Sequence, residues 1–102
     1  MKSIMVAVLA VAGFAVGGHA VADEALAKAK NCFTCHAVDK KLVGPAYKDV
    51  AAKYKGDAKA PAMLAEKVMK GGKGAWGEIP MPPNNVTADE AKKLVAWVLS
   101  QK

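Results

Sequence analysis

Apolar residues recur at helical spacing in several parts of this chain, and no segment shows the two-residue alternation of a half-buried strand. One apolar face consists of Tyr47, Val50, Ala51 and Tyr54. It is followed by Gly56, a residue type that often ends a helix. Another helix is predicted to begin near Pro61, because proline suits the first helical position, and to run to about Lys70. The pattern therefore predicts two helices in the middle of the chain.

Helices are also predicted at the two ends of the region after residue 22. Thr87 and Glu90 have the spacing of a capping box, in which each side chain satisfies a backbone N–H of the other residue. The apolar stripe that follows consists of Ala91, Leu94, Val95, Val98 and Leu99. At the other end, Asp23 and Glu24 favour a helix that runs into a segment with two cysteines. About four helices and no strand predict an all-α fold.

Residues 71–86, GGKGAWGEIPMPPNNV, separate the last two predicted helices and show neither helical period nor alternation. The segment holds four glycines and three prolines, which oppose regular structure. An irregular segment of this length in a small domain is usually functional or disordered. We expect a loop with a function.

Residues 1–22 have the features of a secretory signal peptide. Lys2 provides a positive start, the stretch from Ile4 to Val16 is apolar, and Ala20 and Ala22 supply the small residues of a cleavage site. The alternative is an uncleaved membrane anchor, although glycines and His19 interrupt the apolar stretch. The predicted organisation is a cleaved signal over residues 1–22 and one domain over residues 23–102, exported to the periplasm.

The size and charge of the chain further limit the classes of function it can have. The chain has 102 residues and a formal net charge of +6, with every basic residue a lysine. The lysines are spread along the chain, which argues against a nucleic-acid-binding tail and favours a positive surface that steers an acidic partner. A domain this small has a marginal core, and a metal, cofactor or other cross-link commonly stabilises such a fold.

The only two cysteines lie in the stretch NCFTCH, as Cys32 and Cys35, followed directly by His36. A thioredoxin-type dithiol would need a strand leading into a helix, and no strand is predicted here. A structural zinc site needs four ligands, and the predicted domain has no further cysteine or histidine, so a carboxylate would have to complete the set. A disulfide across two intervening residues would close too short a loop to stabilise much.

Cys-x-x-Cys-His is the attachment signature of a c-type haem. On a helix, Cys32 and Cys35 lie on one face, where both sulfurs can form thioethers with the vinyl groups along one porphyrin edge. His36 lies on the same face and can reach the iron. The motif predicts one covalent haem c, whose apolar surface would also enlarge a small core.

If His36 is one axial ligand, the residue types left for the other are methionine, lysine and the terminal amine, or the position stays open. Met63 and Met69 fall in the third predicted helix, where methionine commonly fills a core or lies on the surface. Met81 lies in IPMPPNN, whose prolines hold the chain in a stiff, extended conformation that can direct a thioether at an iron. Met81 is therefore the predicted second iron ligand.

With Cys32, Cys35, His36 and Met81 assigned, the chain resembles a small bacterial class I cytochrome c of the c-551 (c8) group. The resemblance covers nearly all of residues 23–102. The stretches that carry it are CFTCHAVDKKLVGPAYKDVAAKY, GAWGEIPMPPN and WVLSQK. It implies the all-α class I cytochrome c fold, in which about four helices surround the haem and the first and last helices cross beside it.

The resemblance also implies roles for residues around the haem. The carbonyl of Pro45 would accept the ring N–H of His36, and the indole N–H of Trp76 would donate to a haem propionate. Asn84 would hydrogen-bond near the sulfur of Met81. Lys67 occupies a position where relatives can place an arginine near a propionate, and a compact ammonium lacks the planar fork that binds a carboxylate at two points.

An iron with two protein ligands has no free position for substrate, which predicts a one-electron carrier and not an enzyme. The alternative is a haem protein with a labile sixth position that acts as a peroxidase or gas sensor. The resemblance implies a bc1-type donor and an acceptor such as nitrite reductase, a terminal oxidase or a peroxidase. We expect a monomer that docks through lysines near the haem edge, with candidates Lys30, Lys40, Lys41, Lys70 and Lys73.

Overall fold

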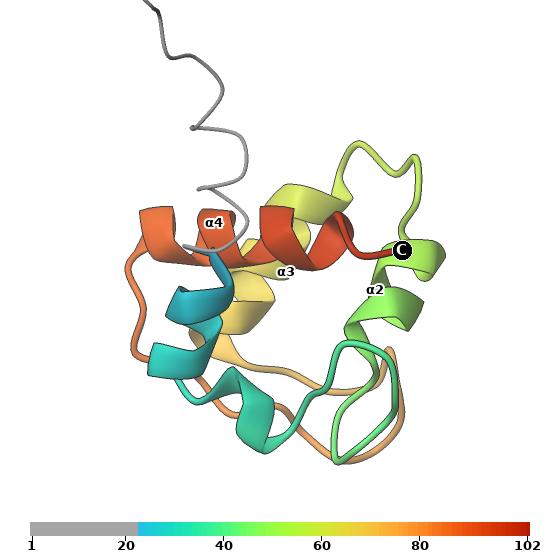
Figure 1. Cartoon of the computed structure of the whole chain (residues 1–102), viewed down its shortest axis with the longest axis horizontal. Coiled ribbons are helices and arrows are strands. Elements are labelled where there is room, and N and C mark those ends of the chain that lie inside the picture. Colours follow the sequence, from blue (N-terminus) through green and yellow to red (C-terminus); the bar gives the residue numbers. More distant parts are fainter. Residues whose placement is uncertain (1–22) are drawn as a thin grey trace, which may run out of the picture.

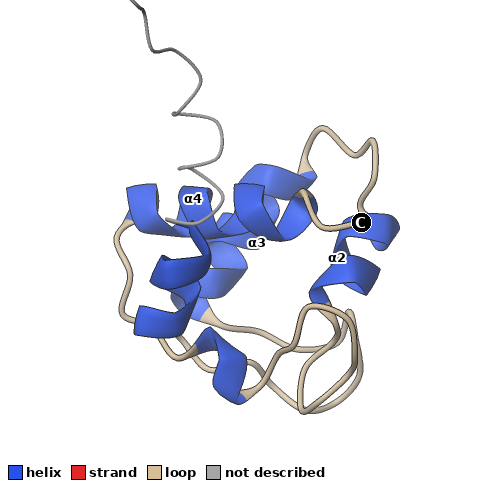
Figure 2. Cartoon of the chain, viewed as in Figure 1, coloured by secondary structure: helices blue, strands red, loops and turns tan. Residues whose placement is uncertain are grey.

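The computed structural model describes residues 23–102, and the regular elements in this part of the chain are helices (Figure 2). A first helical segment covers residues 23–29. It is followed by the 3₁₀ helix η1 (Cys32–Thr34) and the α-helices α2 (Tyr47–Lys53), α3 (Ala60–Lys70) and α4 (Ala88–Leu99). The predicted signal peptide, residues 1–22, lies outside the described residues. The prediction of an all-α fold is confirmed.

The last helix begins as the sequence predicts. The hydroxyl oxygen of Thr87 accepts the backbone N–H of Glu90 at 3.1 Å, and Oε1 of Glu90 accepts the backbone N–H of Thr87 at 2.9 Å. This capping box satisfies two of the backbone donors that the start of a helix leaves unpaired. The buried residues of α4 are Ala91, Leu94, Val95 and Trp97.

The first helix departs from its prediction, because it ends before the cysteine motif. Asn31 adopts a left-handed conformation with φ of 64°, which asparagine tolerates better than most residues. The motif then forms a separate 3₁₀ turn, in which the backbone N–H of His36 donates to the carbonyl of Cys32 at 3.1 Å. Residues three apart eclipse one another in a 3₁₀ helix, so the two cysteines still share one face.

Helix α4 crosses the molecule, with α3 and α2 packed against it (Figure 1). One buried cluster joins these three helices and includes Val50, Leu64 and Val95. A second cluster joins Ala27 of the first helix to Tyr47, Leu94 and Trp97. Alanine, leucine, valine and aromatic side chains from four segments thus form the core. Much of the chain between η1 and α2 and between α3 and α4 runs along the edge farthest from α4 in Figure 1.

The segment between α3 and α4 contains one pair of residues joined as in an antiparallel sheet. The backbone N–H of Gly72 donates to the carbonyl of Met81 at 3.0 Å, and the N–H of Met81 donates to the carbonyl of Gly72 at 2.8 Å. The sequence pattern did not predict this pair. Within residues 23–102, none of the helices is both long enough and apolar enough to cross a membrane.

Candidate functional site

A cavity of about 410 Å³ opens between the segments that the sequence marks as functional. The side of the cavity formed around His36 is called the His36 wall, and its lining residues between 32 and 50 are Cys32, Cys35, His36, Lys41, Val43, Gly44, Pro45, Tyr47, Asp49 and Val50. The side formed by residues 72–82, which belong to no helix, is called the Met81 wall. Apolar residues of α3 and α4 complete the lining, among them Leu64, Leu94 and Val95. Most of the predicted site residues therefore meet in one cavity.

The imidazole of His36 is fixed from three directions. Its Nδ1 lies 2.8 Å from the carbonyl oxygen of Pro45, and because a carbonyl only accepts, Nδ1 carries the proton. Its ring stacks on Tyr47 with centroids 4.9 Å apart and an interplanar angle of 21°. On the remaining side, a Cβ added to Gly44 would stand 2.8 Å from Nδ1. This arrangement leaves Nε2 with a free lone pair, as a metal ligand requires.

Cys32 and Cys35 are both free thiols and partly buried, so neither is used in a disulfide. Burial raises the pKa of the Cys32 thiol, and the hydrogen bond with Tyr47 opposes that rise only in part. Tyr47 is itself 6% exposed, and burial together with the neighbouring Cys32 raises its pKa. Since neither sulfur is used in a disulfide, both are available for thioether bonds to the vinyl groups of a haem.

The Met81 wall is held by its backbone. The Gly72–Met81 pair fixes the main chain at Met81, and Gly71, at φ of 81°, lies so close that an added Cβ would stand 2.5 Å from the carbonyl oxygen of Met81. The prolines at 80, 82 and 83 add stiffness because they fix φ. Met81 is half-buried and lines the cavity.

Two further predicted residues, Lys67 and Trp76, also line the cavity. The stem of Lys67 runs along Gly72, 3.4 Å from the position of an added Cβ. Trp76 is 41% exposed, and the ammonium of Lys53 lies 5.4 Å from its ring centroid, within cation–π range. Lys53 was not singled out from the sequence, since it belongs to another element, α2.

Asn84 does not line the cavity. Its side-chain nitrogen donates to the carbonyl of Val68 at 2.9 Å and to that of Pro82 at 3.2 Å. Its backbone N–H also donates to Val68, at 3.2 Å. Asn84 therefore ties the chain beyond Met81 to α3.

The donor set and the largely apolar lining of the cavity fit a haem better than the alternatives. A largely apolar space with two thiols at one side, an imidazole nitrogen and a thioether matches a porphyrin with covalent attachment and axial ligands. Within residues 23–102, no three or more His, Cys, Asp and Glu side chains gather as a metal-binding cluster, so the zinc alternative has no ligand set in this part of the chain.

A family model described as Cytochrome c matches residues 21–102. The chain belongs to the cytochrome c family. Over 86 residues it is 58% identical to cytochrome c-551 of Pseudomonas aeruginosa, and the match covers 84% of this chain and 83% of that relative. Over 101 residues it is 52% identical to cytochrome c-552 of Hydrogenobacter thermophilus, with 99% and 98% covered.

A solved structure gives the same result for the fold. The crystal structure of wild-type Nitrosomonas europaea cytochrome c552 matches with a TM-score of 0.75 and 51% sequence identity, and the match covers 78% of this chain and 99% of that one. The predicted class I cytochrome c fold is thus confirmed. As a member of this family, the chain is an electron-carrying protein with a covalently attached haem c.

Several residues of the site were not predicted from the sequence. Gly44 and Gly71 matter because backbone or ring atoms approach them closely, and Tyr47 was predicted as a core residue without its contact to His36. Glycines beside a proline or at a helix end are a weak signal of close approach. Of the five lysines predicted near the haem edge, Lys41 and Lys73 line the cavity.

Proposed function

We propose that this cytochrome is a periplasmic one-electron carrier whose haem iron is held by His36 and Met81. The observation that supports it is that His36, Met81 and both cysteines line a single cavity. An imidazole and a thioether together leave no iron position for substrate, which favours electron transfer over catalysis.

When bound, the haem iron supplies a one-electron Fe(III)/Fe(II) couple. The chain's part is to bind, orient and exclude water. Pro45 keeps the Nδ1 proton on His36 and directs Nε2 into the cavity. Met81 provides a neutral thioether, which favours Fe(II) and raises the potential. Apolar residues such as Leu64 and Val95 lower the local dielectric, which disfavours the extra charge of Fe(III).

Substitution of Met81 by alanine tests the ligand assignment. We expect the weak far-red absorption of a sulfur–iron bond to disappear and the potential to fall, because the thioether is lost. Met63→Ala is the matched control, since Met63 is 41% exposed on α3 and does not line the cavity. An unchanged spectrum in Met81→Ala would mean that another residue binds the iron.

Carbon monoxide distinguishes the carrier from the alternative with a labile sixth position. The reduced wild-type protein at neutral pH is expected to bind it only slowly and incompletely, because Met81 occupies the position. Rapid stoichiometric binding would support a gas sensor or peroxidase instead.

Docking is proposed to occur at the mouth of the cavity, where exposed apolar residues meet lysines. Val43 and Ile79 are 53% and 67% exposed, and Lys41 and Lys73 line the same cavity. A positive surface around an apolar centre suits an acidic redox partner such as a bc1-type donor or a nitrite reductase, oxidase or peroxidase acceptor. The second-order rate with such a partner should fall as salt rises. A rate independent of salt would leave these lysines without a steering role.

Residues 1–22 are proposed to act as a cleaved signal that exports the protein, leaving residues 23–102 as the mature domain. Their composition supports this. The mass of the protein purified from the periplasmic fraction would test both export and the cleavage position.

A further inference from the structure

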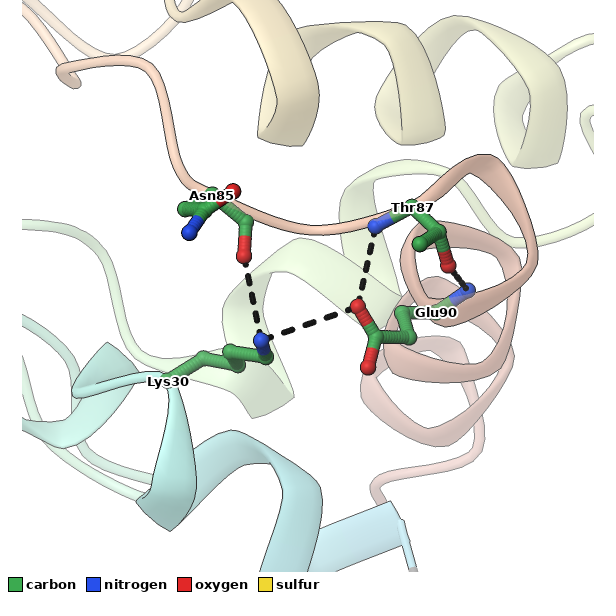
Figure 3. A network of polar contacts seen from close by, with 4 residues as sticks. All are labelled: Lys30, Asn85, Thr87 and Glu90. Atoms are coloured by element: carbon green, nitrogen blue, oxygen red, sulfur yellow. Dashed lines mark hydrogen bonds and ion pairs between the residues drawn. The ribbon is translucent and has the colours of Figure 1, made fainter.

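Lys30 lies two residues before Cys32, just after the first helix ends. Its Nζ donates to the backbone carbonyl of Asn85 at 3.1 Å and lies 3.7 Å from Oε1 of Glu90 (Figure 3). About 30% of its side chain is exposed, so the ammonium is partly shielded. Lys30 therefore joins the cysteine segment to the chain that leads from Met81 into α4.

The stretch that carries Met81 is fastened at three places. At its start, Met81 pairs with Gly72, and further on Asn84 donates twice to Val68. Both of these contacts lead to α3 or to the residues directly after it. The third contact, at Asn85, is made by Lys30.

This third contact has no counterpart elsewhere in the described chain. Among the hydrogen bonds and ion pairs within residues 23–102, those made by Lys30 are the only ones that join residues 23–46 to residues 71–90. The two iron ligands proposed above, His36 and Met81, lie in these two segments. Polar attachment between the segments thus depends on one side chain.

Glu90 holds Lys30 in place for this contact. Oε1 of Glu90 accepts the backbone N–H of Thr87 at 2.9 Å and is the same oxygen that faces the ammonium (Figure 3). The carboxylate is therefore fixed by the capping box of α4 before it meets Lys30. An ammonium has three donors, so one can point to Asn85 while another points to Glu90.

We propose that Lys30 is a positioning residue that holds the Met81 segment against the cysteine segment and slows the departure of the Met81 thioether from the iron. The inference rests on the proposed ligation by Met81. Lys30 does not line the cavity, so it acts through Asn85 and not by contact with the haem. Its engaged ammonium also separates it from the lysines proposed for docking.

The test uses the ferric holoprotein and imidazole as the competing ligand. At saturating imidazole, the rate of ligand exchange is limited by the dissociation of Met81. In Lys30→Met, which keeps the aliphatic stem and removes the charge, this limiting rate should rise about three- to tenfold, the range expected for a partly exposed charged contact. Lys28→Met is the matched control, because Lys28 also precedes the cysteine motif and its one ion pair within residues 23–102 is with Glu24, at 3.6 Å.

Two outcomes would overturn the proposal. One is a limiting rate in Lys30→Met equal to that of the wild type or of Lys28→Met. The other is an equal rise in Leu99→Ala, which weakens the core away from Lys30, because the rate would then follow overall stability. Met81→Ala distinguishes failure of the Lys30 proposal from failure of the proposed function. If Met81→Ala loses the far-red absorption while Lys30→Met exchanges its ligand at the wild-type rate, Met81 is the ligand and Lys30 does not hold the Met81 segment.

Discussion

The His36 wall and the Met81 wall of the cavity are built on different principles. His36 is held through its side chain, by the carbonyl of Pro45 at 2.8 Å and by the ring of Tyr47 at 4.9 Å. Met81 is held through its main chain, by two hydrogen bonds to Gly72. The first arrangement fixes the direction of a ring, whereas the second fixes the position of a backbone and leaves a flexible thioether to find its own direction.

The two walls also differ in how easily their residues can move to accommodate a substitution. Tyr47 is buried and makes edge contacts with Phe33 and Trp97, at centroid distances of 5.9 and 5.4 Å. The residues of the Met81 wall are mostly exposed and belong to no helix. A substitution of equal size should therefore do more damage in the His36 wall than in the Met81 wall.

Gly44→Ala is expected to have the largest effect. The new Cβ would collide with the ring of His36, which Tyr47 and Pro45 prevent from moving, so we expect a loss of about 3 kcal/mol of unfolding free energy or more. The low-spin visible spectrum should be weakened as His36 is displaced. Urea unfolding and the visible spectrum of the holoprotein measure both.

Gly56→Ala is the control for this substitution. Gly56 has φ of 79° but nothing within 4 Å of an added Cβ, so Gly56→Ala reports the cost of a strained backbone alone, about 1–2 kcal/mol, whereas Gly44→Ala, at a residue without a positive φ, reports the collision with His36. If Gly44→Ala costs no more than Gly56→Ala and keeps its spectrum, the His36 wall is less rigid than the contacts indicate.

Gly71→Ala should have a smaller effect on stability and a selective effect on Met81. The φ of 81° is strained for alanine and the Cβ would approach the carbonyl of Met81, but the exposed loop can move, so we expect a cost of about 2 kcal/mol. The far-red sulfur–iron absorption should decrease while the His36-dependent low-spin spectrum is retained. Loss of both signals together would contradict the separation of the two walls.

Lys53→Gln should loosen Trp76 from α2. The ammonium lies 5.4 Å from the ring centroid of Trp76 and 5.8 Å from that of Tyr54, so these cation–π contacts are together expected to contribute about 0.5–1 kcal/mol to the unfolding free energy. Lys55→Gln removes an equal charge from a residue that makes no such contact within residues 23–102. Equal effects of the two substitutions would mean that only charge matters.

The smallest effect is expected from the titration of Glu90. The backbone N–H of Thr87 lowers the pKa of Glu90 below its ordinary value of 4.5, and Lys30 adds to the shift. A lowered pKa means that the carboxylate stabilises the fold above pH 4.5 and that this contribution is lost as the pH falls through the lower, folded-state pKa.

Glu90→Gln should remove this pH dependence and keep the hydrogen bond to Thr87, because glutamine also fits a capping box. The difference in unfolding free energy between wild type and Glu90→Gln should be constant above pH 4.5 and shrink below it. Urea titrations at low ionic strength over this range measure it. A difference that does not change with pH would show that Glu90 gains nothing from its charge.

The helices could be predicted from sequence because their signals are local. The stripe at Val50 and Ala51, the start near Pro61 and the Thr87–Glu90 box each lie within one or two turns of chain. The break at Asn31 was missed, since a single residue in the left-handed conformation leaves no periodic trace. The Gly72–Met81 pair was missed for the same reason, because one isolated pair shows no alternation.

The haem chemistry of the site could be predicted from the sequence, whereas the contacts that position its residues were harder to predict. Cys32, His36 and Met81 could be proposed from the sequence because few residue types can bind a haem iron or its vinyl groups, and their roles as ligands stay predictions. Lys30 carries no such signal, since one lysine among 15 basic residues is unremarkable and its partner Asn85 is 55 positions away. Contacts between a side chain and a distant carbonyl depend on the fold, which composition and spacing do not specify.

The Gly72–Met81 pair has a consequence for protein engineering. Its two main-chain hydrogen bonds make residues 73–80 a loop whose ends are fixed. The entropic cost of closing such a loop grows slowly with its length, by only about 0.6 kcal/mol for each doubling. The loop can therefore be lengthened or its sequence changed with little loss of stability. Recognition sequences for new electron acceptors could be installed there, beside the cavity, while Met81, the proposed iron ligand at the end of the loop, keeps its place.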